Sequence, residues 1–289
     1  MAVTRHHLEE QFMTHDDSTH PGPEPRLATS ADGTSIAYEA YGTGPVIISV
    51  GGAFNERGAG RELARAVAAL GGTGVTYDRR GRGESGDTKP YRVEREIEDL
   101  TAVIRATAGE GPTHVHGVSS GGALVLRALA GRTPATTASV LEPPYRVAGA
   151  PPAPERYLET LEELEARGDR EGILRYFHTR AVGLPEEMLE GMRGTPMWEA
   201  MLALSYTVRY DGLCMRADSA LPEELLAEID VPVLALSSSG TMMPFLPAAA
   251  RAVAAALSRG EYAELEGGFH EVPAATLAPV LVDFSRHHG

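Results

Sequence analysis

The sequence predicts an α/β fold in which a mostly parallel sheet is flanked by helices. Segments of β character alternate with segments of helical character along most of the 289 residues. Residues 46–50 form a continuous apolar run, as expected of a strand buried on both faces of a parallel sheet. The pattern Gly-x-Ser-x-Gly at Gly117 to Gly121 lies between a β-rich run and a helical run, which indicates a strand, a tight turn and a helix.

The elements before residue 146 follow from turn and periodicity signals. Ala-Asp-Gly-Thr and Gly-Thr-Gly sequences separate the first three strands, and Gly71-Gly72 end the first helix. The expected strands are 26–30, 35–41, 46–50, 74–78, the run before Ser119, and 136–141. The expected helices are 61–70, 93–108 and 123–130.

Residues 146–228 interrupt the alternation, because they are rich in Glu, Leu, Arg and Met and contain no strand-like run. We predict a helical cap here, placed over the carboxyl edge of the sheet, where such folds bind ligands. Its expected helices are 154–167, 170–180, 185–193 and 196–210. Alternation then resumes with strand 233–237, helix 247–257, strand 261–265 and helix 275–284.

The predicted organisation is therefore a core made of 26–145 and 229–289, a cap at 146–228, and a flexible extension at 1–25. The extension mixes polar residues without periodicity and has no apolar segment typical of a signal peptide. No run approaches the roughly 18–20 apolar residues that span a bilayer. The single cysteine, Cys214, cannot form an internal disulfide, and a cytoplasmic protein is the simplest interpretation.

Charge limits the expected partners. The formal net charge is −14 and no basic cluster is present, which argues against nucleic acid and anionic membrane surfaces. No His, Cys and carboxylate cluster has the spacing of a metal site, so neither a metal nor another cofactor is expected. A small-molecule substrate is the expected partner, and the sequence predicts no oligomeric state.

Ser119 is the candidate nucleophile. A serine on a strand–turn–helix elbow has a strained backbone and an exposed hydroxyl, and small neighbours allow the sharp bend. The helix that follows would place free backbone N–H groups beside it, and these favour developing negative charge. A serine hydroxyl also needs a base within hydrogen-bond reach.

Four features in order resemble the α/β-hydrolase fold superfamily. They are Val50-Gly51-Gly52-Ala53, Asp78-Arg79-Arg80-Gly81-Arg82-Gly83-Glu84-Ser85, the Gly117–Gly121 elbow, and Glu266-Gly267-Gly268-Phe269-His270. The resemblance covers the chain from about residue 26 onward and implies that His270 is the catalytic base. We interpret the arginine-rich second feature as a structural loop with ion pairs near the elbow, since its spacing is not that of a nucleotide-binding loop.

The resemblance also implies an acid after strand 233–237, but no carboxylate is present there. Thr241 occupies the expected position, and nothing acidic occurs between Asp230 and Glu261. Glu142 ends the preceding strand of the sheet, where it could reach the same imidazole. Haloalkane dehalogenases and the lactonases that open zearalenone are similar in placing the acid after this strand. The alternative role for Glu142 is to bond the loop at the cap hinge.

The remaining site residues are expected around this triad. The resemblance implies two backbone N–H groups as an oxyanion hole, one at Ser120 and the other at Ala53, with Gly52 as the neighbouring choice. Four apolar side chains are expected to line the substrate pocket: Phe54, Trp198, Met242 and Met243.

The predicted function is cofactor-free hydrolysis of an ester or lactone of a medium-sized hydrophobic substrate through an acyl-enzyme. One alternative is a thioesterase or cyclase that releases a biosynthetic acyl chain. Another is a degenerate, non-catalytic hydrolase-fold protein that binds a ligand. Dehalogenase and epoxide hydrolase chemistry is disfavoured because the elbow carries serine where those enzymes use aspartate.

Overall fold

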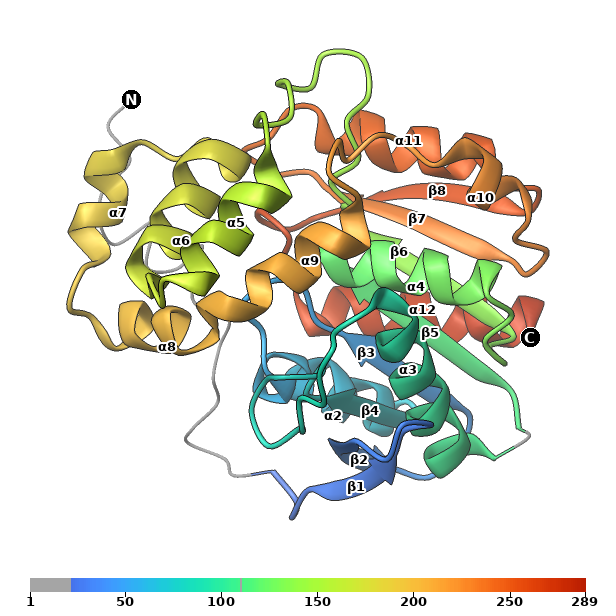
Figure 1. The fold of residues 1–289 in the computed structure, drawn as a ribbon. Coiled ribbons are helices and arrows are strands. Elements are labelled where there is room, and N and C mark those ends of the chain that lie inside the picture. The colour runs from blue at the N-terminus through green and yellow to red at the C-terminus, as the bar shows by residue number, and fades with distance from the viewer. Residues whose placement is uncertain (1–21, 110) are drawn as a thin grey trace.

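The computed structural model describes residues 22–109 and 111–289, so most of the predicted extension at 1–25 lies outside the described residues. An eight-stranded sheet forms its centre, in the order β1-β2-β4-β3-β5-β6-β7-β8 (Figure 1). The β1–β2 and β2–β4 pairs are antiparallel, and every pair from β4 to β8 is parallel. The strands are β1 Arg26–Thr29, β2 Ser35–Gly42, β3 Val46–Val50, β4 Thr73–Tyr77, β5 Thr113–Val118, β6 Thr137–Leu141, β7 Val233–Ser238 and β8 Gly260–Leu265.

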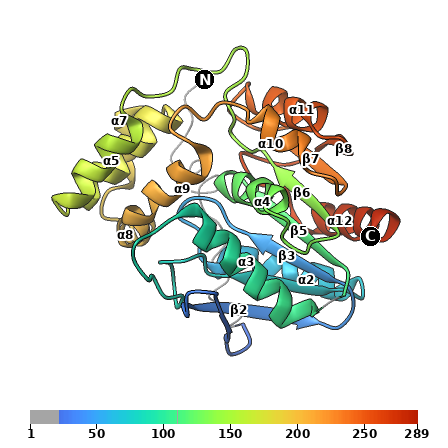
Figure 2. The same cartoon turned by 45° about the vertical axis from the view of Figure 1, so that its right-hand side comes forward.

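Helices cover both faces of this sheet, each over its own apolar core. One face carries α2 and α12, with Val67 and Leu281 packed against strand residues such as Ile47 and Leu234. The other carries α3, α4 and α11, with a larger core that includes Leu100 and Leu124. Figures 1 and 2 show the sheet between these two layers. The helices are α2 Arg61–Ala69, α3 Val93–Ala108, α4 Ser120–Ala130, α11 Leu246–Ala256 and α12 Ala274–His288. The predicted mostly parallel sheet flanked by helices is confirmed.

A group of helices lies between β6 and β7 in the chain and to one side of the sheet (Figures 1 and 2). Its members are α5 Tyr157–Ala166, α6 Arg170–Tyr176, a π-helical turn η2 Phe177–Val182, α7 Glu186–Met192, α8 Pro196–Leu204, a 3₁₀ turn η3 Ser205–Thr207 and α9 Val208–Met215. We call them the inserted helices. A further helix, α10 Glu223–Ala227, falls inside the range predicted for the cap but packs against α4 and α11 on the sheet.

The single helix predicted at 196–210 is wrong, because the chain changes direction at η3. The hydroxyl groups of Ser205 and Thr207 donate to the carbonyl oxygens of Leu202 and Leu204. Side-chain bonds of this kind compete with the regular helical pattern. The interruption gives α9 its own direction, and α9 packs against α4, which follows the elbow.

Parallel pairing brings the ends of β3, β5, β6, β7 and β8 to one edge of the sheet. Val50 pairs with Gly117, Val118 with Leu141, and Leu141 with Leu236. The segments that follow these strands therefore lie side by side, although they are far apart in sequence. No helix within residues 22–109 and 111–289 is long and apolar enough to cross a membrane.

Candidate active site

Ser119 lies on a sharp turn between β5 and α4, with φ 54° and ψ −123°. Close packing requires glycine on both sides of this turn. A Cβ atom on Gly117 would lie 2.6 Å from the carbonyl oxygen of Gly121, and one on Gly121 would lie 2.4 Å from that of Val50. The Ser119 N–H donates to Leu141 O at 2.9 Å, which ties the turn to β6. The sequence motif is thus a strained elbow in the structure.

Glu142 and His270 meet at the same edge of the sheet. Glu142 Oε2 lies 2.9 Å from Nδ1 of His270 and accepts the His270 backbone N–H at 2.9 Å. The carboxylate is fully buried, whereas the imidazole is 20% exposed. Burial raises the pKa of Glu142, but the contacts with His270 and with backbone N–H groups outweigh it and lower this pKa below its usual value. The carboxylate is therefore ionised and points at the imidazole.

Ser238, at the end of β7, explains how the acid reaches His270 from β6. Its backbone N–H donates to Glu142 Oε1 at 3.0 Å, and its hydroxyl oxygen lies 3.0 Å from the same atom. The strand after which the resemblance expects an acid thus supplies hydrogen-bond donors to Glu142 instead. Thr241, which occupies the position where the resemblance expects the acid, has a buried hydroxyl without a hydrogen-bond partner in the described structure.

The site contains four of the eight non-glycine residues with positive φ in the described structure. Ser119, Glu142 and His270 have positive φ values of 54°, 48° and 54°, as does Phe54 at 59° in the loop after β3. Left-handed backbone is unfavourable for residues with a Cβ and persists where the surroundings enforce it, which occurs most often at functional sites. Four such residues lie at one edge of the sheet, and this identifies the edge as the candidate active site.

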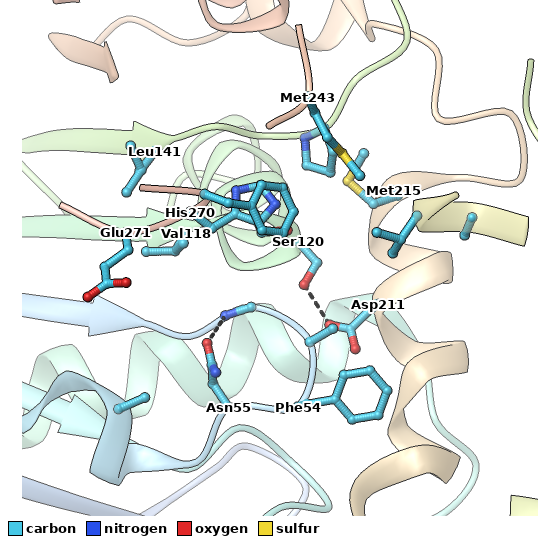
Figure 3. A pocket seen from close by; sticks show the side chains of 18 of the residues that line it. Phe54, Asn55, Val118, Ser120, Leu141, Asp211, Met215, Met243, His270 and Glu271 are labelled. Atoms are coloured by element: carbon cyan, nitrogen blue, oxygen red, sulfur yellow. Dashed lines mark hydrogen bonds between the residues drawn. The ribbon is translucent and has the colours of Figure 1, made fainter. Parts of the chain in front are cut away.

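The loop after β3 faces the elbow, and its two candidate donors, Gly52 and Ala53, differ in their hydrogen bonding. The Gly52 N–H is already bonded to Asn55 Oδ1 at 3.2 Å (Figure 3). The Ala53 N–H donates to no acceptor in the described part of the chain. Ser120 is the first residue of α4, and the N–H groups of a first helical turn have no acceptor within the helix. Of the two choices in this loop, the geometry therefore favours Ala53 over Gly52 as a donor to an anion.

Two arginines from the Asp78–Ser85 loop bond to several of the segments that form the candidate active site. Arg79 Nη1 lies 2.6 Å from Asp211 Oδ1, and Arg82 Nη2 lies 2.8 Å from Asp211 Oδ2. Asp211 also accepts the hydroxyl of Ser120 at 2.7 Å (Figure 3). The same guanidinium groups donate to the carbonyl oxygens of Gly51 and Gly52. We call Arg79, Arg82, Asp211 and Ser120 the buried charge network.

The buried charge network links four separate segments: the loops after β3 and β4, the start of α4, and α9 of the inserted helices. Burial raises the pKa of Asp211, but Arg82 and Arg79 outweigh it and lower this pKa below its usual value. Arg79 also pairs with Glu96, from Nε at 2.7 Å. Asp211 is the principal site residue that sequence analysis missed. The signal for it was indirect, since three buried arginines need carboxylate partners elsewhere in the chain.

A cavity of about 420 Å³ opens over the elbow. Ser119, Ser120, His270, Gly52 and Ala53 all line it, together with residues of the inserted helices. Of the predicted apolar lining residues, Phe54 and Met243 do line the cavity (Figure 3).

Two predicted lining residues are not brought to this cavity. Trp198 is 3% exposed and packs with Leu174, Leu189 and Met192 inside the inserted helices. Met242 is 37% exposed and is not among the residues that line the cavity. The rest of the apolar wall comes from five other side chains: Phe177, Met197, Met201, Met215 and Phe245. Among the described residues, no three His, Cys, Asp or Glu side chains are grouped so that they could hold a metal ion.

Comparison with known proteins agrees with this architecture. The model of the alpha/beta hydrolase family matches residues 48–281. The chain belongs to the alpha/beta hydrolase family. A crystal structure of an alpha/beta hydrolase from Sphaerobacter thermophilus DSM 20745 is 40% identical to it, covering 90% of this chain and 99% of that one with a TM-score of 0.82.

More distant structures share the fold of this alpha/beta hydrolase. An esterase from Rhodococcus sp. ECU1013 is 20% identical, with 92% and 99% of the two chains covered and a TM-score of 0.63. An enol-lactonase from Burkholderia xenovorans LB400 is 18% identical, with 91% and 97% covered and a TM-score of 0.59. No curated protein matched the sequence.

Proposed function

We propose that this alpha/beta hydrolase is a serine hydrolase that cleaves an ester or lactone through an acyl-enzyme. The observation that carries the proposal is the contact between the buried, ionised Glu142 and Nδ1 of His270, in the same site as Ser119. A carboxylate at Nδ1 fixes the imidazole tautomer, leaves Nε2 to act as the base, and stabilises the imidazolium that forms. Esterases and an enol-lactonase among the structural neighbours are consistent with this chemistry.

The mechanism uses residues of this chain alone. Ser119 Oγ attacks the carbonyl carbon while His270 accepts its proton, and the oxyanion is stabilised by the N–H groups of Ser120 and Ala53. His270 then donates the proton to the leaving oxygen, which gives the acyl-enzyme and releases the alcohol. In a lactone the alcohol stays attached to the acyl chain. Water, activated by His270, attacks the acyl carbon and restores Ser119.

The inserted helices serve in this proposal as a cap that closes the cavity over Ser119. Their apolar side chains, with Phe54 from the loop after β3, form a wall that favours a medium-sized apolar body in the substrate. The proposed partner is accordingly a small molecule, and the reaction requires no cofactor.

Labelling with a fluorophosphonate probe tests the proposal. We expect the wild-type protein to be labelled stoichiometrically and Ser119→Ala to be unlabelled, because the probe reacts with an activated serine hydroxyl. Ser239→Ala is a matched control, since it removes an exposed hydroxyl near the site and should not affect labelling. A wild-type protein that resists the probe and hydrolyses no member of an ester, lactone and thioester panel would overturn the proposal in favour of ligand binding alone. Preferential hydrolysis of carrier-bound thioesters would replace it with a thioesterase.

A further inference from the structure

Arg146 lines the cavity, and its backbone is bonded to the segment around Ser219. It follows β6 four residues after Glu142 and precedes the inserted helices. The Arg146 N–H donates to Ser219 O at 2.7 Å, and Arg146 forms an isolated bridge with Ala220. Arg146 thus joins the segment that enters the inserted helices to the segment that leaves them, and this fixes its backbone at the cavity wall.

The guanidinium group of Arg146 has no counter-charge in the described structure. Its hydrogen bond goes to the carbonyl oxygen of Pro151, and its Nε atom is buried without a partner. By contrast, the fully buried guanidinium groups of Arg79, Arg80 and Arg82 all pair with carboxylates. Burial lowers the pKa of Arg146, as expected for a cation that has lost water without gaining an anion. A buried donor without a partner is costly and is stabilised when a ligand supplies an acceptor.

The other ionisable groups that line the cavity do not place an uncompensated, buried negative charge beside Arg146. Asp211 is compensated by Arg79 and Arg82 of the buried charge network. Glu62 and Glu271 are exposed at the cavity wall, so water screens their charge. The imidazoles of His116 and His178 are buried, and burial lowers the pKa of each, which favours the neutral form near pH 7. Tyr157 also lines the cavity and lies close enough to Arg146 for an electrostatic interaction.

We propose that Arg146 binds a carboxylate group of the substrate, so that the ester or lactone cleaved by Ser119 carries a free acid at a distance from the scissile bond. The inference rests on the proposed function and narrows its substrate class. A guanidinium binds a carboxylate through two parallel N–H···O bonds, and one unpaired arginine matches one negative charge. The apolar wall would then contact the body of the substrate, and Arg146 would fix its orientation.

A matched pair of esters tests the inference. 4-Nitrophenyl hydrogen glutarate and 4-nitrophenyl valerate have acyl chains of the same length and differ in the terminal carboxylate. We expect the wild-type kcat/KM to be higher for the glutarate ester. Arg146→Gln should lower the ratio of the two kcat/KM values about 10- to 100-fold, mainly through KM, as loss of a charge-assisted hydrogen bond implies. Arg146→Lys should retain part of the ratio, because it keeps the charge but not the two-pronged geometry.

Arg167→Gln is the control, since it removes one positive charge from an exposed position outside the cavity. It should leave the ratio unchanged. Thermal unfolding of each variant checks that the protein is folded. An unchanged ratio in folded Arg146→Gln, or a wild-type preference for the valerate ester, would overturn the inference.

A binding measurement separates this inference from the proposed function. Calorimetric titration of Ser119→Ala with glutarate requires no catalysis, and binding should be lost in Ser119→Ala/Arg146→Gln. Arg146-dependent binding by a protein that neither hydrolyses esters nor reacts with fluorophosphonate would contradict the proposed function and retain the anion site. The opposite result is a protein that hydrolyses esters and reacts with the probe but binds glutarate either not at all or independently of Arg146. That result would contradict the anion site and leave the proposed function intact.

Discussion

Glu142→Gln is expected to lower kcat by about 10³- to 10⁴-fold, the effect seen when the acid of a Ser-His-Asp triad becomes an amide. Glutamine keeps the shape of the side chain but removes the charge that stabilises imidazolium. In the wild-type protein both oxygens of Glu142 accept hydrogen bonds, Oε1 from the Ser238 N–H and Oε2 from the His270 N–H. In either orientation, the NH₂ group of glutamine would therefore face another donor. Steady-state kinetics on an activated ester and the rate of fluorophosphonate labelling both measure the loss.

Glu266→Gln is the matched control for this prediction. Glu266 is exposed in the segment between β8 and His270 and does not line the cavity, so removing its charge should change kcat less than about twofold. Thermal unfolding shows whether the Glu142→Gln protein is folded under the assay conditions. Turnover near that of the wild type in folded Glu142→Gln would show that Glu142 only bonds the loop at the base of the inserted helices. Glu142 would then not be the catalytic acid that partners His270.

Asp211→Ala is expected to destabilise the fold by about 3–5 kcal/mol, the usual cost of breaking a buried ion pair from one side. Arg79 would keep Glu96 as a partner. Arg82, whose guanidinium group is 1% exposed, would lose the carboxylate that it contacts at 2.8 and 2.9 Å. The midpoint of urea unfolding, compared at constant m-value, measures the change. Labelling of Ser119 should slow as well, because Asp211 holds Ser120 and Arg82 holds the loop after β3.

Two further variants show whether charge is the cause. Asp230→Ala removes the same side chain from an ion pair with Arg132 that is about 70% exposed on both sides, and it should change stability by less than about 1 kcal/mol. Adding Arg82→Met to Asp211→Ala should recover part of the lost stability, since it removes the uncompensated cation. Two results would contradict this explanation. One is an equal loss of unfolding free energy in Asp211→Ala and Asp230→Ala. The other is a double variant that is less stable than Asp211→Ala by the full amount that Arg82→Met costs in the wild-type protein.

Local sequence signals were sufficient for the sheet and the elbow. The apolar run at 46–50 and the alternation of strands and helices depend on periodicity and burial, which adjacent residues determine. The Gly-x-Ser-x-Gly turn depends on the absence of a Cβ at two positions, which is also a local property. The helix predicted at 196–210 failed because hydroxyl groups competed with the helical pattern, which propensity alone does not capture.

The lining of the cavity could not be predicted in the same way. Trp198 and Met201 lie in one helix three residues apart, yet the first is packed inside the inserted helices and the second also reaches the cavity. Residues three apart lie on the same side of a helix, so the apolar pattern gives both the same burial. The packing of the neighbouring helices decides which of them contacts a ligand.

The sequence by itself determined that the chain forms a mostly parallel α/β sheet with a strained serine after its fifth strand, and it proposed Glu142 and His270 as that serine's partners. Only the tertiary structure decided that Glu142 reaches His270, since Ser238 and a positive φ at Glu142 orient the carboxylate across two strands. The tertiary structure also decided which charges are compensated, pairing Asp211 with two arginines more than 120 residues away and leaving Arg146 without a carboxylate partner among the described residues. The physical reason is that hydrophobic periodicity is read within a few residues, whereas ion pairing depends on segments that meet only in the folded chain.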